Sequence, residues 1–191
     1  MSRWNPNARG RLEQAALELY SERGFEQTTV SDIAARAGLT ERTFFRHFTD
    51  KREVLFGGAG ALQESVMKRV SEAPLSLTAI EAVTLALGSA DVFVPERREY
   101  ARQRQRLLAA NPELQERELM KLASMSAALA GALRGRGSPD TTASLTADAG
   151  MAIFMAAFGR WIDEPGSPEF GQLMRQALGE LRAVLARPAS E

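Results

Sequence analysis

Two arginines one helical turn apart, Arg42 and Arg46, are the side chains of this sequence best suited to recognising a partner. A guanidinium can donate two parallel hydrogen bonds to a guanine edge, and one good pair contributes about 1–3 kcal/mol of discrimination between bases. Neighbouring hydroxyl, imidazole and ammonium groups suit phosphate oxygens. The candidate DNA-contacting residues are Thr29, Thr40, Glu41, Arg42, Thr43, Phe45, Arg46, His47 and Lys51.

Two helix patterns precede these arginines. Apolar residues recur at helical spacing from Leu12 to Tyr20, so residues from about 8 to 23 are expected to form an amphipathic helix that ends at Gly24. Thr29 and Asp32 have the spacing of a capping box that starts a second helix. Gly38 is suited to end that helix in the left-handed conformation.

Thr40 is expected to cap a third helix that runs through about His47, with Phe44 and Phe48 turned inward. Two short helices separated by the break Ala37-Gly38-Leu39 predict a helix-turn-helix, whose second helix lies in a DNA major groove. Of the charged residues from 40 to 52, four are basic and two acidic, while the formal net charge of the whole chain is zero. A small basic patch on a neutral chain favours recognition of short sites over nonspecific coating of nucleic acid.

The motifs TTVSDIA (28–34), AGLT (37–40) and TFFRHF (43–48), followed by DK (50–51) and VL (54–55), resemble the TetR family of bacterial transcriptional regulators. The resemblance implies a three-helix DNA-binding domain at residues 1–50 and a helical effector-binding and dimerisation domain at 51–191. It further implies a homodimeric repressor that binds a near-palindromic operator on double-stranded DNA and is released by a small-molecule effector, although some members activate transcription. Phe45 stands where the family commonly has a Tyr that contacts a phosphate. The expected phosphate contacts therefore rest more on His47 and Lys51.

A fourth helix is expected from Asp50 and Glu53 to about Glu72, and it contains Gly57, Gly58 and Gly60. Glycine is unfavourable inside a helix by about 1 kcal/mol relative to alanine, so this cluster indicates either close packing with a local kink, or a hinge. Five further helices are expected near residues 77–93, 96–110, 113–134, 141–163 and 168–187, where the apolar spacing stays helical between Pro and Gly breaks. The chain is therefore predicted to be all-α, with about nine helices.

The helix expected at 141–163 is apolar nearly all round, with small residues on one stripe and bulky ones on the opposite side. Such a helix must be buried on both sides, and together with the last helix it predicts a twofold four-helix interface. The alternative is that both helices pack only within one subunit. The candidate dimer-interface residues are Ala149, Ala152, Ala156, Gly159, Phe170, Leu173, Met174, Ala177, Leu181 and Val184.

Large, adaptable side chains in the same region are candidates for an apolar effector pocket, although such residues also form ordinary core. They are Met67, Phe93, Met120, Met125, Phe154, Phe158 and Trp161. Five arginines between Arg97 and Arg106 suit either an anionic ligand or a solvated helix face. The segment RLLAANPEL (106–114), followed by Arg117-Glu118, resembles the carboxy-terminal domain of mycofactocin-type regulators, which makes an acyl-coenzyme A or another lipophilic effector the expected ligand.

Composition narrows the remaining classes of function. The chain has no Cys and a single His, and no glycine-rich loop follows a strand pattern, so no catalytic set, metal site or cofactor is expected. The segment Met1–Pro6 lacks an apolar leader and no run approaches the roughly 18 apolar residues of a membrane span, so a cytoplasmic protein with no membrane partner is expected. A helical interaction module that has lost DNA affinity is the competing interpretation, and the missing Tyr is the only feature that favours it.

Overall fold

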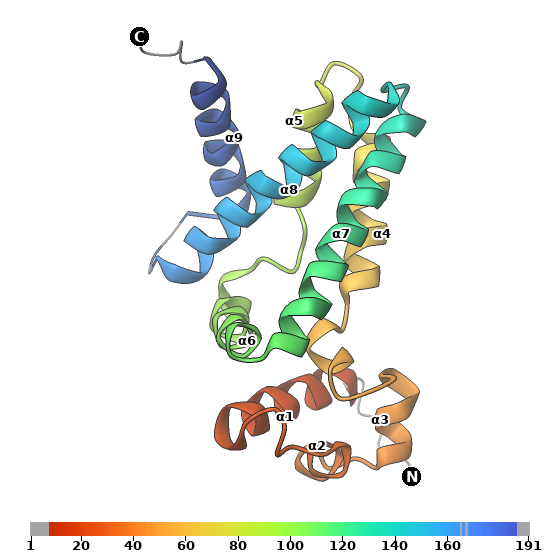
Figure 1. Cartoon of the computed structure of the whole chain (residues 1–191), viewed down its shortest axis with the longest axis vertical. Coiled ribbons are helices and arrows are strands. Elements are labelled where there is room, and N and C mark those ends of the chain that lie inside the picture. Colours follow the sequence, from red (N-terminus) through yellow and green to blue (C-terminus); the bar gives the residue numbers. More distant parts are fainter. Residues whose placement is uncertain (1–7, 165, 167, 187–191) are drawn as a thin grey trace. The chain divides into compact units, whose positions relative to one another are not determined.

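The computed structural model describes residues 8–164, 166 and 168–186, so the expectations for Met1–Pro6 and for the end of the last helix lie outside the described residues (Figure 1). Across these residues the chain is all-helical and contains no strand, as predicted. The nine α-helices and two short 3-10 helices in this part of the chain are α1 (Ala8–Arg23), α2 (Val30–Arg36), α3 (Glu41–His47), η1 (Glu53–Phe56), α4 (Ala59–Glu72), α5 (Ala79–Gly88), η2 (Pro95–Arg97), α6 (Arg98–Ala110), α7 (Pro112–Gly135), α8 (Asp140–Asp163) and α9 (Phe170–Ala186).

The chain divides into two compact units, and neither is a continuous stretch of sequence. One unit comprises Met1–Ala59 with Tyr100–Glu118, and the other comprises Gly60–Glu99 with Leu119–Glu191. The first unit therefore contains α1 to α3, η1, most of α6 and the first turns of α7. The boundary crosses α4, α6 and α7 within their own lengths, so these helices link the two units covalently.

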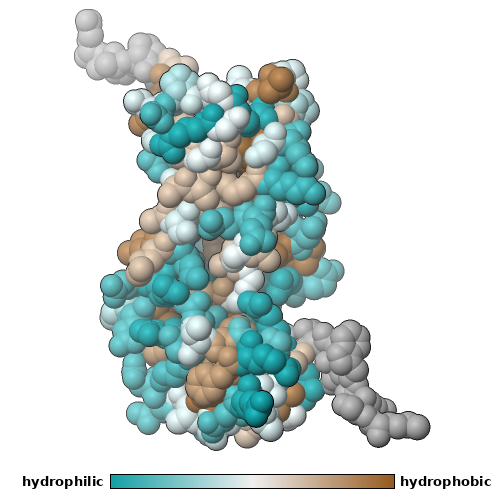
Figure 2. Space-filling model, turned by 90° about the vertical axis from the view of Figure 1, so that its right-hand side faces the viewer, coloured by the Kyte–Doolittle hydropathy of each residue, from teal (hydrophilic) through white to brown (hydrophobic). Residues whose placement is uncertain are grey.

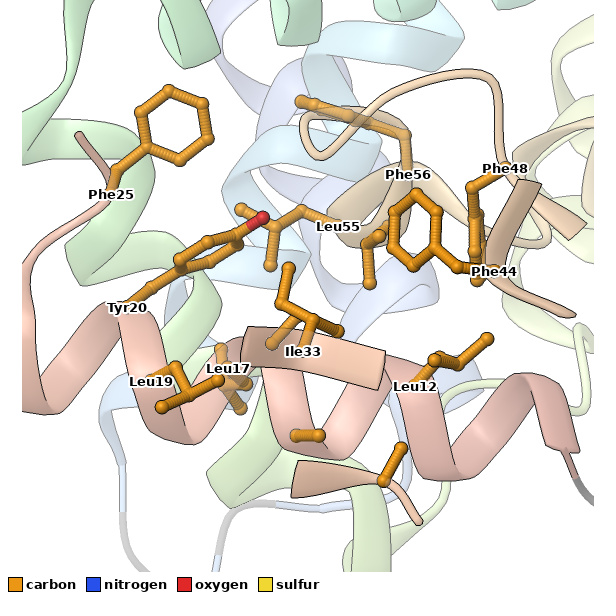
Figure 3. Packing of buried hydrophobic residues seen from close by; sticks show 14 of the residues in the cluster. Leu12, Leu17, Leu19, Tyr20, Phe25, Ile33, Phe44, Phe48, Leu55 and Phe56 are labelled. Atoms are coloured by element: carbon orange, nitrogen blue, oxygen red, sulfur yellow. The ribbon is translucent and has the colours of Figure 1, made fainter. Parts of the chain in front are cut away.

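The core of the first unit forms around α1, whose inward face carries Leu12, Leu19 and Tyr20 (Figure 3). Ile33 from α2 and the ring of Phe44 from α3 pack into the same cluster. Leu108 and Leu114 show that the core is completed by α6 and α7. The two helices of the turn motif are thus held from behind by side chains distant in sequence.

The expected fourth helix is interrupted. Asp50 Oδ1 accepts hydrogen bonds from the amides of Arg52 (2.8 Å) and Glu53 (3.1 Å), which starts η1, and α4 begins only at Ala59. Gly58 has a φ of +93°, outside the helical region, and an added Cβ at Gly57 would lie 3.0 Å from the Phe48 ring. Close packing accounts for Gly57 and the interruption of the helix accounts for Gly58, while the hinge remains a hypothesis.

In the second unit α5, α8 and α9 pack on one another, and α4 runs beside α7 (Figure 1). Gly88 and Gly171 allow close approach of α5 and α9, since a Cβ on Gly88 would lie 3.1 Å from the Gly171 Cα. The helix expected at 77–93 ends at Gly88, so Phe93 lies in the segment that leads to η2. Arg136 donates to the carbonyls of Val70 (3.0 Å) and Ala73 (2.6 Å), which ties α7 to the end of α4.

Helix α8 is the one described helix long and apolar enough, by length and composition, to cross a membrane. One such helix does not overturn the expectation of no membrane span, because the core helix of a globular protein passes the same test. Only 28% of its apolar window is buried inside the chain. Asp148 lies in the middle of the helix and accepts a hydrogen bond from Ser126 Oγ at 2.6 Å, and a carboxylate at the centre of a bilayer is strongly unfavourable. The exposed apolar surface therefore fits a protein partner better than lipid.

Candidate functional site

Local contacts fix the start of α2 and the turn between α2 and α3. Thr29 and Asp32 form the predicted capping box: the Thr29 hydroxyl donates to the Asp32 carboxylate (2.7 Å) and accepts from the Asp32 amide (3.1 Å). The hydrogen bond from the Thr29 hydroxyl holds the pKa of Asp32 below its usual value. Gly38 adopts a φ of +63°, which glycine permits at little steric cost. Arg11 of α1 donates to the carbonyl of Ala37, so a long-range contact also holds this turn.

Helix α3 is anchored by phenylalanines on its inner side. Thr40 caps the helix by accepting from the Thr43 amide at 3.2 Å. Phe44 is fully buried and Phe48, the C-cap residue, is almost so, with 5.5 Å between their ring centroids. The prediction that this stripe packs inward is confirmed (Figure 3).

The opposite side of α3 is open to solvent. Glu41, Arg42 and Arg46 are exposed, and Phe45 is 55% exposed. Within the described residues, no hydrogen bond or ion pair engages the guanidinium groups of Arg42 and Arg46. Figure 2 shows hydrophilic residues around a small hydrophobic patch on the unit that carries α3. Two unpaired cations and an aromatic ring on one short helix form a surface suited to base edges and thymine methyl groups.

His47, at the end of α3, lies in a less open environment. Its Nε2 is buried and has no hydrogen-bond partner. Burial, and then the charges of Arg46 and Arg9, lower the pKa of His47 below 6.5. The imidazole is therefore neutral at pH 7, and its expected contact with a phosphate requires a neutral donor or protonation upon binding.

Lys51 is committed to this chain's own backbone. Its ammonium donates to the carbonyls of Phe25 (2.9 Å), Glu26 (3.3 Å) and Thr28 (3.2 Å) and lies 4.3 Å from the centroid of the Phe25 ring. An ammonium has three donors, so all three are in use. The Tyr20 hydroxyl donates to the Lys51 carbonyl at 2.5 Å, and burial raises the pKa of Tyr20. Together these contacts fasten the loop that leads into α2.

Two ion-pair groups outside the expected residues support the unit. Arg36 of α2 pairs with Glu22 (2.8 Å) and Glu18 (3.3 Å) of α1, and the hydrogen bond from Arg36 lowers the pKa of Glu22. Arg104 of α6 donates to the Leu55 carbonyl (2.7 Å) and pairs with Glu118 of α7 (2.6 Å). These contacts join residues 14 or more positions apart, and no local spacing rule signals them.

In the second unit the structure brings together four of the seven candidate effector residues. Phe93 contacts Phe154, Phe158 and Trp161 with its ring edge-on, at centroid distances of 5.6, 6.2 and 5.7 Å, and it stacks on Phe170 at 4.0 Å. Phe93, Phe154 and Phe158 are only partly buried. Of the remaining candidates, Met125 is buried, Met67 half-buried and Met120 56% exposed.

The arginines expected between Arg97 and Arg106 have different environments. Arg104 is paired as described above, and Arg97 and Arg106 are exposed. Arg98 lies over the Trp161 ring, with 5.5 Å from its Cζ to the ring centroid, and its Nε is buried without a hydrogen-bond partner. Among the described residues, Arg98 is the only cation that lies over a ring of the aromatic cluster.

The candidate dimer-interface residues fall into two groups. Ala152 and Ala156 of α8 are exposed and Ala149 and Gly159 partly so, with Leu145 (66% exposed) and Met155 (42% exposed) beside them. We call these six residues the small-residue face of α8. On α9, Val184 is 66% exposed and Leu181 partly exposed. The side chains buried inside the chain, and therefore unable to face a second one, are Phe170, Leu173, Met174 and Ala177.

No group of three or more His, Asp or Glu residues in the described ranges is arranged to hold a metal ion. Family models match the chain in two places. Residues 13–56 match the model of bacterial regulatory proteins of the tetR family, and residues 77–186 match the model of the MftR C-terminal domain.

Two curated relatives are similar to this chain over different lengths. The chain is 23% identical over 154 residues to a Mycobacterium tuberculosis protein whose name describes it as a mycofactocin biosynthesis transcriptional regulator, MftR, covering 79% of this chain and 78% of that protein. It is 36% identical over 76 residues to the HTH-type transcriptional regulator TcmR of Streptomyces glaucescens. That match spans 40% of this chain and about a third (34%) of the length of TcmR.

Solved structures share the fold at low sequence identity. FadR of Bacillus subtilis in complex with stearoyl-CoA has a TM-score of 0.62 at 21% identity, covering 90% of this chain and 96% of that one. SmeT, the repressor of the Stenotrophomonas maltophilia multidrug efflux pump SmeDEF, has a TM-score of 0.53 at 19% identity, covering 95% and 94%. Both likenesses support an all-helical chain with an amino-terminal helix-turn-helix.

Proposed function

Because this chain belongs to the TetR family of bacterial regulatory proteins and carries an MftR-type carboxy-terminal domain, we propose that it is a homodimeric repressor released from its operator by a small lipophilic effector. That it is a DNA-binding transcriptional regulator, and not an enzyme, follows from the family. The observation that carries the proposal is the outer side of α3, where Phe45 is exposed and Arg42 and Arg46 are exposed with no ion pair to the described residues, while Phe44 anchors the helix from behind.

In the proposed complex α3 lies in the major groove. Arg42 and Arg46 donate to guanine edges, Phe45 contacts a thymine methyl or a sugar, and Glu41 and Thr43 lie beside the bases. Thr29, Thr40 and His47 contact phosphates and fix the register of the protein on the duplex. Lys51 belongs to this set by position, but its three donors already bind carbonyls, so we assign it the role of holding the loop before α2.

We propose that the small-residue face of α8 and the exposed end of α9 form the dimer interface. Small residues allow two helices to approach closely, and the exposed apolar area on α8 is otherwise unexplained in a single chain. A twofold pair presents two copies of α3 to successive major grooves about 34–36 Å apart, and this arrangement predicts a near-palindromic operator. Bacterial chromosomal DNA lies in the cytoplasm, so the proposed protein acts there.

The proposed effector binds in the second unit, at the aromatic cluster of Phe93, Phe154, Phe158 and Trp161. An apolar site suits a lipophilic ligand. The solved complex of FadR with stearoyl-CoA, a protein that shares the fold of this chain, supports a lipophilic ligand. To change operator occupancy from about 99:1 to 1:99, the effector must favour the non-binding conformation by about 5.5 kcal/mol, so a ligand with equal affinity for both conformations cannot act as inducer.

Selection from a pool of randomised duplexes tests this function whatever the operator sequence is. The full-length protein should enrich a two-part, near-palindromic sequence, and log K for the enriched site should fall steeply with log salt concentration because several phosphates are contacted. A pool that stays random after repeated selection with folded protein would contradict sequence-specific binding.

A further inference from the structure

Arg98 lies at the edge of an aromatic cluster and has no counterion among the described residues. Its guanidinium lies over the Trp161 ring, its Nε is buried without a hydrogen-bond partner, and the described carboxylates form no ion pair with it. Arg104, on the same helix, has a carboxylate partner in Glu118 at 2.6 Å. Arg98 is thus partly buried and, unlike Arg104, has no anionic partner in the described part of the chain.

An unpaired charge at such a place is unfavourable, because desolvation weakens its hydration and no partner replaces the lost interaction. The interaction of a cation with the Trp161 ring offsets part of that loss. A buried guanidinium Nε–H needs an acceptor, and an anionic oxygen satisfies both the charge and the donor. The position therefore favours a bound anion.

The neighbouring surface sets the second property of the ligand. Phe93, Phe154 and Phe158 are only partly buried, so part of each of these residues in the cluster remains accessible. The contacts within the cluster are edge-on and stacked arrangements of rings. Aromatic pairs in these geometries contribute more than their buried area alone, so a flat aromatic ligand is favoured over an aliphatic one of equal size.

We propose that Arg98 and the rings of Phe93, Phe154, Phe158 and Trp161 form a site for a small aromatic carboxylate. The carboxylate accepts from the Arg98 guanidinium, and the ring packs against the partly buried phenylalanines. The inference deepens the proposed function, on which it rests, by naming the chemical class of effector. It differs from an acyl-coenzyme A, whose thioester has no free carboxylate.

Ligand-observed NMR with the full-length protein in the absence of DNA tests the site directly. The probes are benzoate, benzyl alcohol as the uncharged analogue, and cyclohexanecarboxylate as the non-aromatic one. Benzoate should bind saturably, and each of the other two should bind more weakly. For benzyl alcohol the loss should be about tenfold or more, the usual effect of removing a hydrogen bond to a charged group.

Variants of Arg98 test whether its guanidinium binds the carboxylate. Arg98→Met keeps the apolar stem and removes the charge, and it should weaken benzoate binding about tenfold or more while leaving benzyl alcohol binding unchanged. Arg97→Met, at the exposed neighbouring position, is the matched control and should bind benzoate like the wild type. Arg98→Lys should recover part of the affinity. Trp161 emission in a Trp4→Phe background provides a second measurement at the site itself.

The proposal is overturned if benzoate fails to bind saturably, if benzyl alcohol binds equally well, if cyclohexanecarboxylate binds more tightly, or if Arg98→Met matches the wild type. The series on wild-type protein needs no variant, so misfolding of Arg98→Met cannot obscure the result. DNA binding measured in parallel separates the two claims. A protein that binds its selected operator but not benzoate keeps the proposed function and loses this site, whereas one that binds benzoate but selects no DNA loses the function.

Discussion

Arg42 occupies the first turn of α3, exposed and free of ion pairs in the described part of the chain. If it donates to a guanine, Arg42→Ala should cost about 1–3 kcal/mol on the selected operator and relax base preference at one position of each half-site. Fluorescence anisotropy on operator and on substituted duplexes measures both. Equal losses on specific and random DNA would show that Arg42 contributes charge alone.

For Lys51 we expect a role in stability and not in DNA contact, because its donors bind the carbonyls of Phe25, Glu26 and Thr28. Lys51→Met should lower the free energy of unfolding by about 1–3 kcal/mol through the lost charged hydrogen bonds. The slope of log K against log salt should stay at the wild-type value, since no phosphate contact is lost. A slope reduced by about one, with unchanged stability, would instead identify Lys51 as a phosphate ligand.

His47 predicts a pH dependence, and it is the only histidine in the chain. Its pKa in the folded protein is lowered, first by burial, so the native state prefers the neutral ring. The resulting stability is present above 6.5 and is lost as the pH falls from there toward the folded pKa. Thermal melts at a series of pH values should show this decline, and His47→Gln should flatten it. An identical decline in the variant would exclude His47 as its source.

At the scale of elements, the turn between α2 and α3 determines how α3 is presented. Gly38→Ala places a Cβ at a φ of +63°, which strains the backbone, and 2.8 Å from Arg11 Nη2, so the guanidinium that binds the Ala37 carbonyl must shift. We expect a loss of about 1–2 kcal/mol in stability and a weaker DNA affinity. Chemical denaturation and anisotropy measure the two effects.

Gly137→Ala is the matched control for this turn. Gly137 has a φ of +92° but no atom within 4 Å of the added Cβ, so the backbone strain is similar and no contact is displaced. It should lower stability without changing operator affinity. DNA binding by Gly38→Ala equal to that of Gly137→Ala would show that the turn tolerates the loss of the Arg11 contact.

Local chemistry explains which features were predictable from the sequence. The Thr29 and Thr40 caps and the left-handed Gly38 depend on residues no more than four apart, and each was predicted correctly. The contacts of Arg11 and Lys51 join residues 23 to 27 positions apart, so they depend on how the helices pack. The break at Gly58 was missed because the apolar spacing continues through it, and only the φ of +93° reveals it.

At the scale of the molecule, the proposed dimer explains why α8 leaves most of its apolar window uncovered. Ala152→Glu would bury an uncompensated carboxylate in that interface, at a cost of about 3–5 kcal/mol, and should produce monomers in analytical ultracentrifugation. Ala123→Glu, at an exposed alanine of α7, is the matched control and should remain dimeric. Dimers of unchanged affinity in the Ala152→Glu variant would place the interface elsewhere.

The long-range organisation of the chain was less accessible from sequence than the motif at its start. The residues of α3 and its caps were identified correctly as a group, because helix-turn-helix spacing is short and regular. The association of α6 and the start of α7 with the first unit depends on Leu108 and Arg104 of α6 and Leu114 of α7, which look like ordinary helix residues in the sequence. Some of the dimer candidates on α9 are buried inside the chain and others are exposed. The sequence could not separate them, because an apolar stripe does not indicate whether its own chain or a second chain will cover it.

The most direct test of the central claim, that paired copies of α3 enter the DNA grooves, is a hydroxyl-radical footprint on the selected operator. Two protected patches should appear on one face of the duplex, related by twofold symmetry and about 10–10.5 base pairs apart between centres. The protection should weaken in both patches with Arg42→Ala. A single protected patch, or diffuse protection without symmetry, would contradict the account.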